Sequence, residues 1–218
     1  RISCEALGAN DSYHYSSHTA FVVSDIAGTA TPNPADLPPF SVAWDVEADL
    51  VEGGERRQAT VKIRDAGSQS ETTVIEVGTD SWNNFGPGTD FAKREDGTSL
   101  PFPPDETCRS IGAELDLAAM TGVPEKVNGI SSLKYEVEAL PSRALSNIPS
   151  IGPGADAVTV VKEYSGAVWV ASDGYISKLD LSGAGDYEGG RRAMNVDLAY
   201  EYSDINGVDT EIVAPAPR

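Results

Sequence analysis

The sequence is poor in cysteine, histidine and basic residues, and it has no long apolar run. Its 218 residues include two cysteines, two histidines and 16 lysines and arginines, against 34 aspartates and glutamates. No stretch reaches the roughly 18 consecutive apolar residues of a membrane-spanning helix, so we expect no such span. The formal net charge of −18 would repel nucleic-acid phosphates and anionic lipid headgroups. These shortages exclude nucleic acid as a partner and favour a salty or extracellular setting.

The two cysteines, Cys4 and Cys108, are too few for a structural zinc site and form no C-x-x-C motif. If they were paired, they would close a loop of about a hundred residues. The loss of chain entropy in the unfolded state would then stabilise the fold by roughly 4–5 kcal/mol. A disulfide would tether residues 1–16 as an N-terminal extension and would imply an oxidising compartment, so we expect a secreted or cell-surface protein. The alternative is two unrelated free thiols. Residues 1–11 lack a signal-peptide pattern, so any export signal is expected to have been removed or never present.

Few residues are suited to catalysis or metal binding. His14 and His18 are four residues apart, but no third metal ligand is evident beside them. A serine nucleophile elbow, G-x-S-x-G, is absent from the sequence. The turn region with Asp180, Asp186 and Glu188 offers oxygen ligands for calcium but lacks the EF-hand spacing. The sequence therefore predicts no enzyme, no cofactor and no metal site.

Period-two alternation of apolar and polar residues dominates the chain. Such alternation predicts antiparallel strands with one buried and one solvated face. It is clearest in residues 40–50, 59–65, 72–78, 132–140, 157–164 and 193–204. A helix is expected from Asp105, with Ile111, Leu115 and Met120 on one side, and a second short helix from Pro141. Towards the C-terminus, TEIVAPAPR predicts one short strand before a proline-rich end.

The stretch VWVASDGYISKLDLSG, residues 168–183, predicts a β-hairpin. Asp173-Gly174 would supply the positive φ angles of a tight turn, and β-rich runs flank it. The arm from Tyr175 to Leu181 is expected to line the apolar side of the sheet. No internal boundary interrupts the pattern, so we expect one domain with helices covering a sheet face.

Three stretches together resemble the LolA-like lipoprotein-carrier superfamily, including its LppX/LprG type. The hairpin at 168–183 is similar to the late hairpin of that group. LAYEYSDINGVDTEIVAPAP is similar to its closing strands, and EKVNGISSLKYEVEAL to the strand that follows its central helix. The order and spacing of the three stretches carry the resemblance, which covers residues 17–214 and leaves 215–218 as a tail.

The resemblance implies a mainly β fold with minor α. The sheet would be a strongly curved, antiparallel, unclosed half-barrel with one or two helices covering its concave face. That face would be an apolar groove for a lipid or acyl chain. The implied groove residues are Phe40, Trp44, Val46, Val61, Ile63, Ile111, Leu115, Leu133, Tyr135, Val137, Val168, Val170, Val196, Leu198 and Tyr200.

Two functions fit these observations. The first is an extracytoplasmic, non-enzymatic protein that binds a hydrophobic ligand, since each methylene moved out of water gains about 0.8 kcal/mol. The second is a structural or interaction subunit of a cell-surface or extracellular assembly, with protein partners. In the second case the same apolar side chains simply fill the core.

Overall fold

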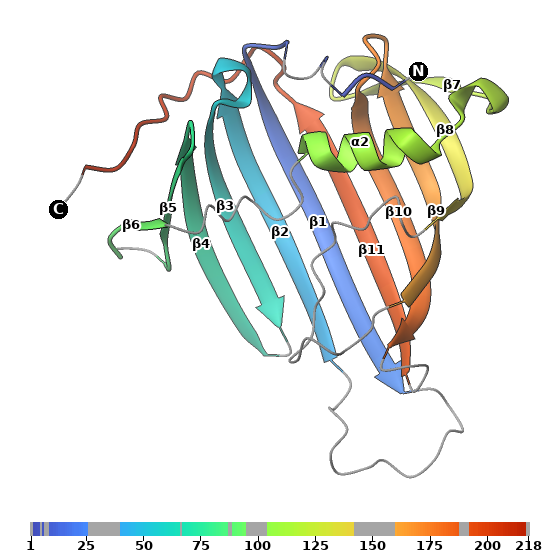
Figure 1. Ribbon diagram of the computed structural model, residues 1–218, viewed down its shortest axis with the longest axis horizontal. Helices are drawn as coiled ribbons and strands as arrows, with labels where there is room; N and C mark the ends of the chain where they lie inside the picture. Colours follow the sequence, from blue (N-terminus) through green and yellow to red (C-terminus); the bar gives the residue numbers. More distant parts are fainter. Residues whose placement is uncertain are drawn as a thin grey trace.

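The protein is built around one large antiparallel sheet (Figure 1). The computed structural model describes residues 2–4, 6, 9–25, 40–65, 67–86, 89–94, 104–141, 160–187 and 192–216. Its strands are β1 (Ser12–Asp25), β2 (Phe40–Val51), β3 (Arg56–Asp65), β4 (Ser68–Val77), β5 (Asp80–Asn84), β6 (Ala92–Arg94), β7 (Val123–Val127), β8 (Ile130–Pro141), β9 (Val160–Ala171), β10 (Ile176–Tyr187) and β11 (Arg192–Ser203).

The sheet is open, so the expected mainly β, unclosed half-barrel is confirmed. The strands lie in the order β6-β5-β4-β3-β2-β1-β11-β10-β9-β8-β7, and every neighbouring pair is antiparallel. The first and last strands, β1 and β11, lie side by side in the middle (Figure 1). The sheet therefore has two halves, β1–β6 and β7–β11, which pair with each other along β1 and β11.

Both edges of the sheet are poor templates for a further strand. β6 has three residues and includes Lys93 and Arg94. β7 has five residues and includes Pro124, Glu125 and Lys126. Short, charged and proline-containing edge strands disfavour pairing with another sheet.

The register places apolar residues of β1 and β11 on one face. Along the β1–β11 pair, Tyr15 lies opposite Tyr202 and Phe21 opposite Val196, and all four side chains are buried. Tyr13 and Tyr200 extend this row, and ring centroids within the tyrosine group are 5.5 to 6.0 Å apart. Residues two apart in a strand share a face, so the alternating apolar residues of the paired strands form one continuous apolar surface.

Strand β9 is longer than the sequence indicated. The runs at 157–164 and 168–170 were expected as separate strands, but residues 160–171 form one strand. Gly166 joins them with φ of +144°, and a Cβ there would collide with the carbonyl of Asp180 on β10. Glycine is needed at this position because two backbones meet there.

Irregular pairing changes which residues face the core in two strands. In β8 a register shift between Val137 and Leu140 leaves Ala139 exposed and buries Leu140. In β10 a shift between Ile176 and Lys178 puts Ile176 opposite Val170. Strict alternation predicted Ala139 inside and Ile176 outside, and both predictions were wrong for this reason.

The predicted hairpin forms, but its turn is longer than expected. β9 ends at Ala171 and β10 begins at Ile176. The amide of Ala171 donates to the carbonyl of Tyr175, and the amide of Gly174 donates to the carbonyl of Ala171. Gly174 has φ of +97°, whereas Asp173 is not in the left-handed region. The turn therefore needs one positive φ, at the glycine.

One predicted helix is present as α2 (Pro104–Glu114), which lies across the sheet over β11, β10 and β9 (Figure 1). Cys108 and Ile111 are buried, and Leu115, one residue past its end, packs against the same core. The 3-10 turn η2 (Leu117–Ala119) follows, capped by the Asp116 carboxylate on the amide of Ala118. A further 3-10 turn, η1 (Glu52–Gly54), connects β2 and β3.

The second expected helix lies almost entirely outside the described residues. Its predicted first residue, Pro141, is the last residue of β8. At the other end of the domain, β1 begins at Ser12, inside the stretch expected to be an N-terminal extension. No helix among the described residues is long and apolar enough to cross a membrane.

The segment after β11 is not the short strand that TEIVAPAPR suggested. Residues 208–216 form no regular structure, yet Ile212 is buried. Arg56 donates a hydrogen bond to the carbonyl of Ile212 at 3.0 Å, and Thr210 donates one to the Asp49 carboxylate at 3.1 Å. Side chains of the sheet hold this tail, so it gains its contacts without strand pairing.

Candidate functional site

The face of the sheet that α2 covers is apolar across its central strands, and we call it the concave face. Most of the predicted groove residues are buried there: Val46, Val61, Ile111, Tyr135, Val137, Val168, Val170, Val196, Leu198 and Tyr200. Four more are partly buried and pack against the same core: Phe40, Trp44, Ile63 and Leu115. Leu133 shares the face but is 40% exposed. The sequence thus predicted the composition of this surface, and ligand binding by it stays a prediction.

The concave face also contains the polar groups of Arg192, Tyr164 and Tyr200, and of these three residues only Tyr200 was among the predicted groove residues. Arg192, at the start of β11, is buried. Burial raises the pKa of Tyr200 well above its ordinary value of 10 and that of Tyr164 to about 12. The two tyrosines are therefore neutral, and they add hydroxyl groups without adding charge.

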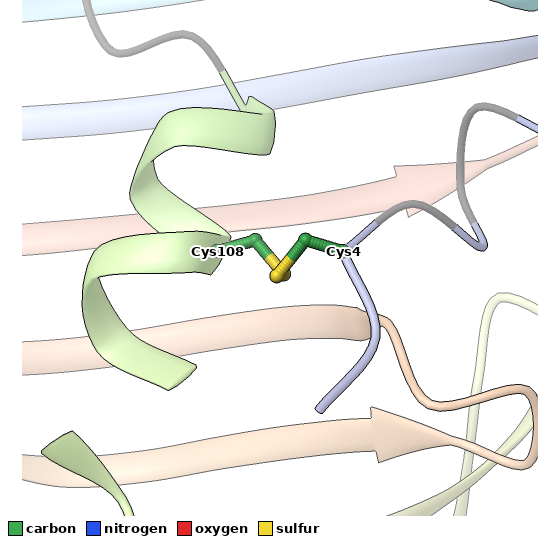
Figure 2. The surroundings of a disulfide bond; sticks show 2 residues. All are labelled: Cys4 and Cys108. Atoms are coloured by element: carbon green, nitrogen blue, oxygen red, sulfur yellow. A yellow bond between two sulfur atoms is a disulfide. The ribbon is translucent and has the colours of Figure 1, made fainter. Parts of the chain in front are cut away.

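A disulfide joins the N-terminal segment to the covering helix, as the sequence predicted. Cys4 is bonded to Cys108 of α2, with 5.7 Å between their Cα atoms (Figure 2). Ile2, Cys4 and Ala6 all pack against the core. Ile2, Cys4, Ala6 and α2 therefore cover part of the concave face together.

The concave face opens at one end of the sheet in a pocket of about 560 Å³, which we call the mouth pocket. It lies between η2 and the ends of β7, β8 and β9. Its lining residues are Leu117, Ala118, Pro124, Ser131, Ser132, Leu133, Tyr135, Val170, Ala171, Ser172 and Gly174. None of these described lining residues carries a charge, and the volume is within the range of small-molecule sites.

The floor of the mouth pocket combines the core residues Tyr135 and Val170 with the partly exposed Leu133. Leu133 and Val170 are paired across β8 and β9, and Tyr135 is paired with Val168. The Tyr135 ring lies so close to Gly122 that a Cβ on this glycine would be 2.9 Å from it. Leu133, Tyr135 and Val170 were among the groove residues that the resemblance implied. The η2 and β7 contributions were missed, since a 3-10 turn and a short proline-containing edge strand give no periodic signal.

A second pocket of about 870 Å³ lies near the sheet edge, between β5 and the C-terminal tail. Trp82 and Phe91 line it, but so do Asp80, Asp90 and Lys93. Asp80 and Lys93 form an ion pair at 2.9 Å. Although this pocket is larger, its fixed charges suit an apolar ligand less well than the mouth pocket does.

Both histidines lie on the opposite, convex face. His14 lies between Asp49 and Glu47, at 2.8 and 2.9 Å. His18 lies 2.6 Å from Asp45, which also pairs with Arg64. Within the described part of the chain, no group of three or more histidine, cysteine or carboxylate side chains is placed to hold a metal ion.

The acidic turn region considered for calcium lies only partly within the described residues. The Asp180 side chain is on the polar side of β10, where Asp180 pairs with Ala199 of β11. The side chain of Asp186 and the whole of Glu188 lie outside the described residues.

No family model matches the chain, and no curated protein matches it. Among solved structures, the chain is similar to the LolA superfamily protein NE2245 from Nitrosomonas europaea, at 12% sequence identity. The match covers 97% of this chain and 96% of that protein, with a TM-score of 0.29. A TM-score of this size does not establish a shared fold, so the half-barrel description depends on the sheet itself.

Proposed function

We propose that the protein is a non-enzymatic, extracytoplasmic binder of a hydrophobic ligand such as a lipid or acyl chain. The ligand would enter at the mouth pocket and lie against the concave face. The observation that carries this proposal is the mouth pocket, whose described lining residues carry no charge and include the buried Tyr135 and Val170 beside the 40% exposed Leu133.

Binding of this kind needs no charged contact. Each methylene moved from water to an apolar surface gains about 0.8 kcal/mol, so a chain of six to eight carbons gains roughly 5–6 kcal/mol before the costs of association. The net charge of −18 does not oppose an uncharged tail. The resemblance of residues 168–183 and 198–217 to LolA-like carriers supports the same class of ligand.

The disulfide supports the proposed location. Disulfides persist in secreted, periplasmic and cell-surface proteins and are rare in reducing compartments. A protein outside the cytoplasm that handles lipids must shield their chains from water, and a covered apolar face can do this.

A pair of matched substitutions tests the proposal. Leu133 and Val22 are exposed apolar strand residues, at 40% and 43%, on the concave and convex faces respectively. The probe is N-phenyl-1-naphthylamine, an uncharged dye that fluoresces when it leaves water. We expect Leu133→Glu to weaken dye binding at least about tenfold, because a carboxylate in the mouth pocket must be desolvated.

Val22→Glu is expected to bind the dye as the unchanged protein does. Equal losses in both variants, or no dye binding by the unchanged protein, would contradict the proposal. In that case the core is simply filled, as in the assembly-subunit alternative. Native mass spectrometry of freshly isolated protein gives an independent measurement, since a bound lipid adds a discrete mass.

A further inference from the structure

The two sides of the mouth pocket are connected through the Cys4–Cys108 disulfide. On one side, Gly174 of the β9–β10 turn lines the pocket and accepts a hydrogen bond from the amide of Ser3 at 2.7 Å. Cys4 is the next residue and is bonded to Cys108 of α2. On the other side, Leu117 of η2 lines the pocket three residues after α2 ends. This path runs from one rim of the pocket to the other.

Several described side chains of α2 and of the segment that follows it contact the core. The described buried side chains of α2 are Cys108 and Ile111, with Leu115 partly buried just beyond its end. The N-terminal segment adds Ile2, which lies so close to Gly112 that a Cβ on this glycine would be 3.1 Å from it. The covalent bond adds to these contacts and ties α2 to the N-terminal segment.

We propose that the Cys4–Cys108 disulfide is a redox-sensitive clamp that sets how fast ligand passes through the mouth pocket. This inference rests on the proposed function, because it describes how the same site is controlled. In the oxidised protein, η2 and the Gly174 turn are held at a fixed separation. In the reduced protein, α2 and η2 move away from the rim more often, and ligand exchanges faster.

The clamp opens by thiol–disulfide exchange with a dithiol. Cys4 is partly exposed, whereas Cys108 is buried. A donor thiolate attacks the Cys4 sulfur, the S–S bond breaks, and Cys108 leaves as a thiolate that takes up a proton. The second donor thiol then attacks the mixed disulfide and releases Cys4 as a thiol. Two electrons and two protons pass to the protein, and the dithiol becomes a disulfide.

The test compares dissociation of N-phenyl-1-naphthylamine from the oxidised and the dithiothreitol-reduced protein. We expect reduction to raise the dissociation rate at least about tenfold. The double variant Cys4→Ser, Cys108→Ser is expected to show the fast rate with or without dithiothreitol. Hydrogen exchange measured in parallel should increase in residues 104–119 and stay unchanged in β1 and β11.

A second variant separates the clamp from general loosening. Ile212→Ala removes a buried side chain of the C-terminal tail and leaves the disulfide intact. It is expected to lower overall stability while keeping the slow, dithiothreitol-sensitive dissociation. The clamp is overturned if Ile212→Ala alone gives the fast rate, or if reduction loosens every strand to the same extent.

The remaining outcomes distinguish this inference from the proposed function. Equal dissociation rates in the oxidised and reduced protein overturn the clamp and leave ligand binding standing. Failure of both forms to bind the dye overturns both proposals together.

Discussion

Neighbouring acidic residues change the pKa of His14. Its Nδ1 lies 2.8 Å from an oxygen of Asp49, and its Nε2 lies 2.9 Å from an oxygen of Glu47. Partial burial lowers the pKa of His14, but the hydrogen bonds and negative charges of Asp49 and Glu47 raise it by more. The pKa is therefore raised from its ordinary value of 6.5.

This shift predicts a pH-dependent contribution of His14 to stability. A group whose pKa is raised by folding stabilises the folded state fully below its unfolded pKa. That contribution is lost as the pH rises through the folded pKa. We expect the free energy of unfolding of the unchanged protein, minus that of His14→Gln, to be larger at pH 6 than at pH 8.

Denaturant unfolding of the two proteins at both pH values measures this difference. The substitution is a suitable reference because glutamine does not titrate in this range. NMR titration of the His14 ring gives the folded pKa directly, and a midpoint at or below 6.5 would contradict the prediction.

At the scale of elements, alternation predicted most of the sheet. The long strands β2 and β11 follow the apolar pattern, and β8 follows it up to Val137, because each has one face in the core and one in solvent. The helix α2 was found from its cap and its apolar spacing. Prediction worked wherever an element is long enough to repeat its period several times.

The features of the sheet that were predicted wrongly or not at all depend on contacts that the alternation within one strand does not show. The register shifts near Leu140 and Ile176 depend on the partner strand, so they cannot be read from one strand alone. Residues 92–94 form β6, which was not predicted because three residues carry no detectable alternation. Gly166 lies between two runs that were expected as separate strands, and it permits the close approach of β9 to β10.

The C-terminal tail shows that an element without regular structure still stabilises the fold. Ile212 is 2% exposed, and its neighbour Val213 is 54% exposed. Truncation of a fully buried isoleucine costs about 2–5 kcal/mol, because both apolar burial and packing are lost. We expect Ile212→Ala to lower the free energy of unfolding by that amount.

Val213→Ala is the matched control. An exposed substitution of this size is expected to change stability by less than about 0.5 kcal/mol. Guanidinium unfolding of both variants gives the comparison. Equal effects at the two positions would mean that the tail does not pack against the sheet in solution.

For the whole molecule, the candidate site was only partly predictable. The apolar residues of the concave face follow from strand periodicity. The mouth pocket depends on where η2, β7 and the β9–β10 turn meet, which involves segments far apart in the sequence. The disulfide could be predicted from two cysteines, but the connection that it makes between Gly174 and α2 could not.

The excess of negative charge makes a prediction for the whole molecule. Acidic residues outnumber basic ones 34 to 16. Described ion pairs such as Arg56–Glu52 and Lys93–Asp80 have largely exposed partners, so each contributes little. Repulsion among the remaining carboxylates opposes the compact state. Added salt should therefore stabilise the protein.

We expect the melting temperature to rise by several degrees between about 10 mM and about 150 mM salt, as the Debye length falls from about 30 Å to about 8 Å. Sodium chloride and potassium chloride should give the same curve, because screening depends on ionic strength and not on the identity of the cation. A melting temperature that falls with salt would mean that attractive ion pairs outweigh the repulsion. A rise with only one of the two salts would instead point to specific cation binding on the acidic surface.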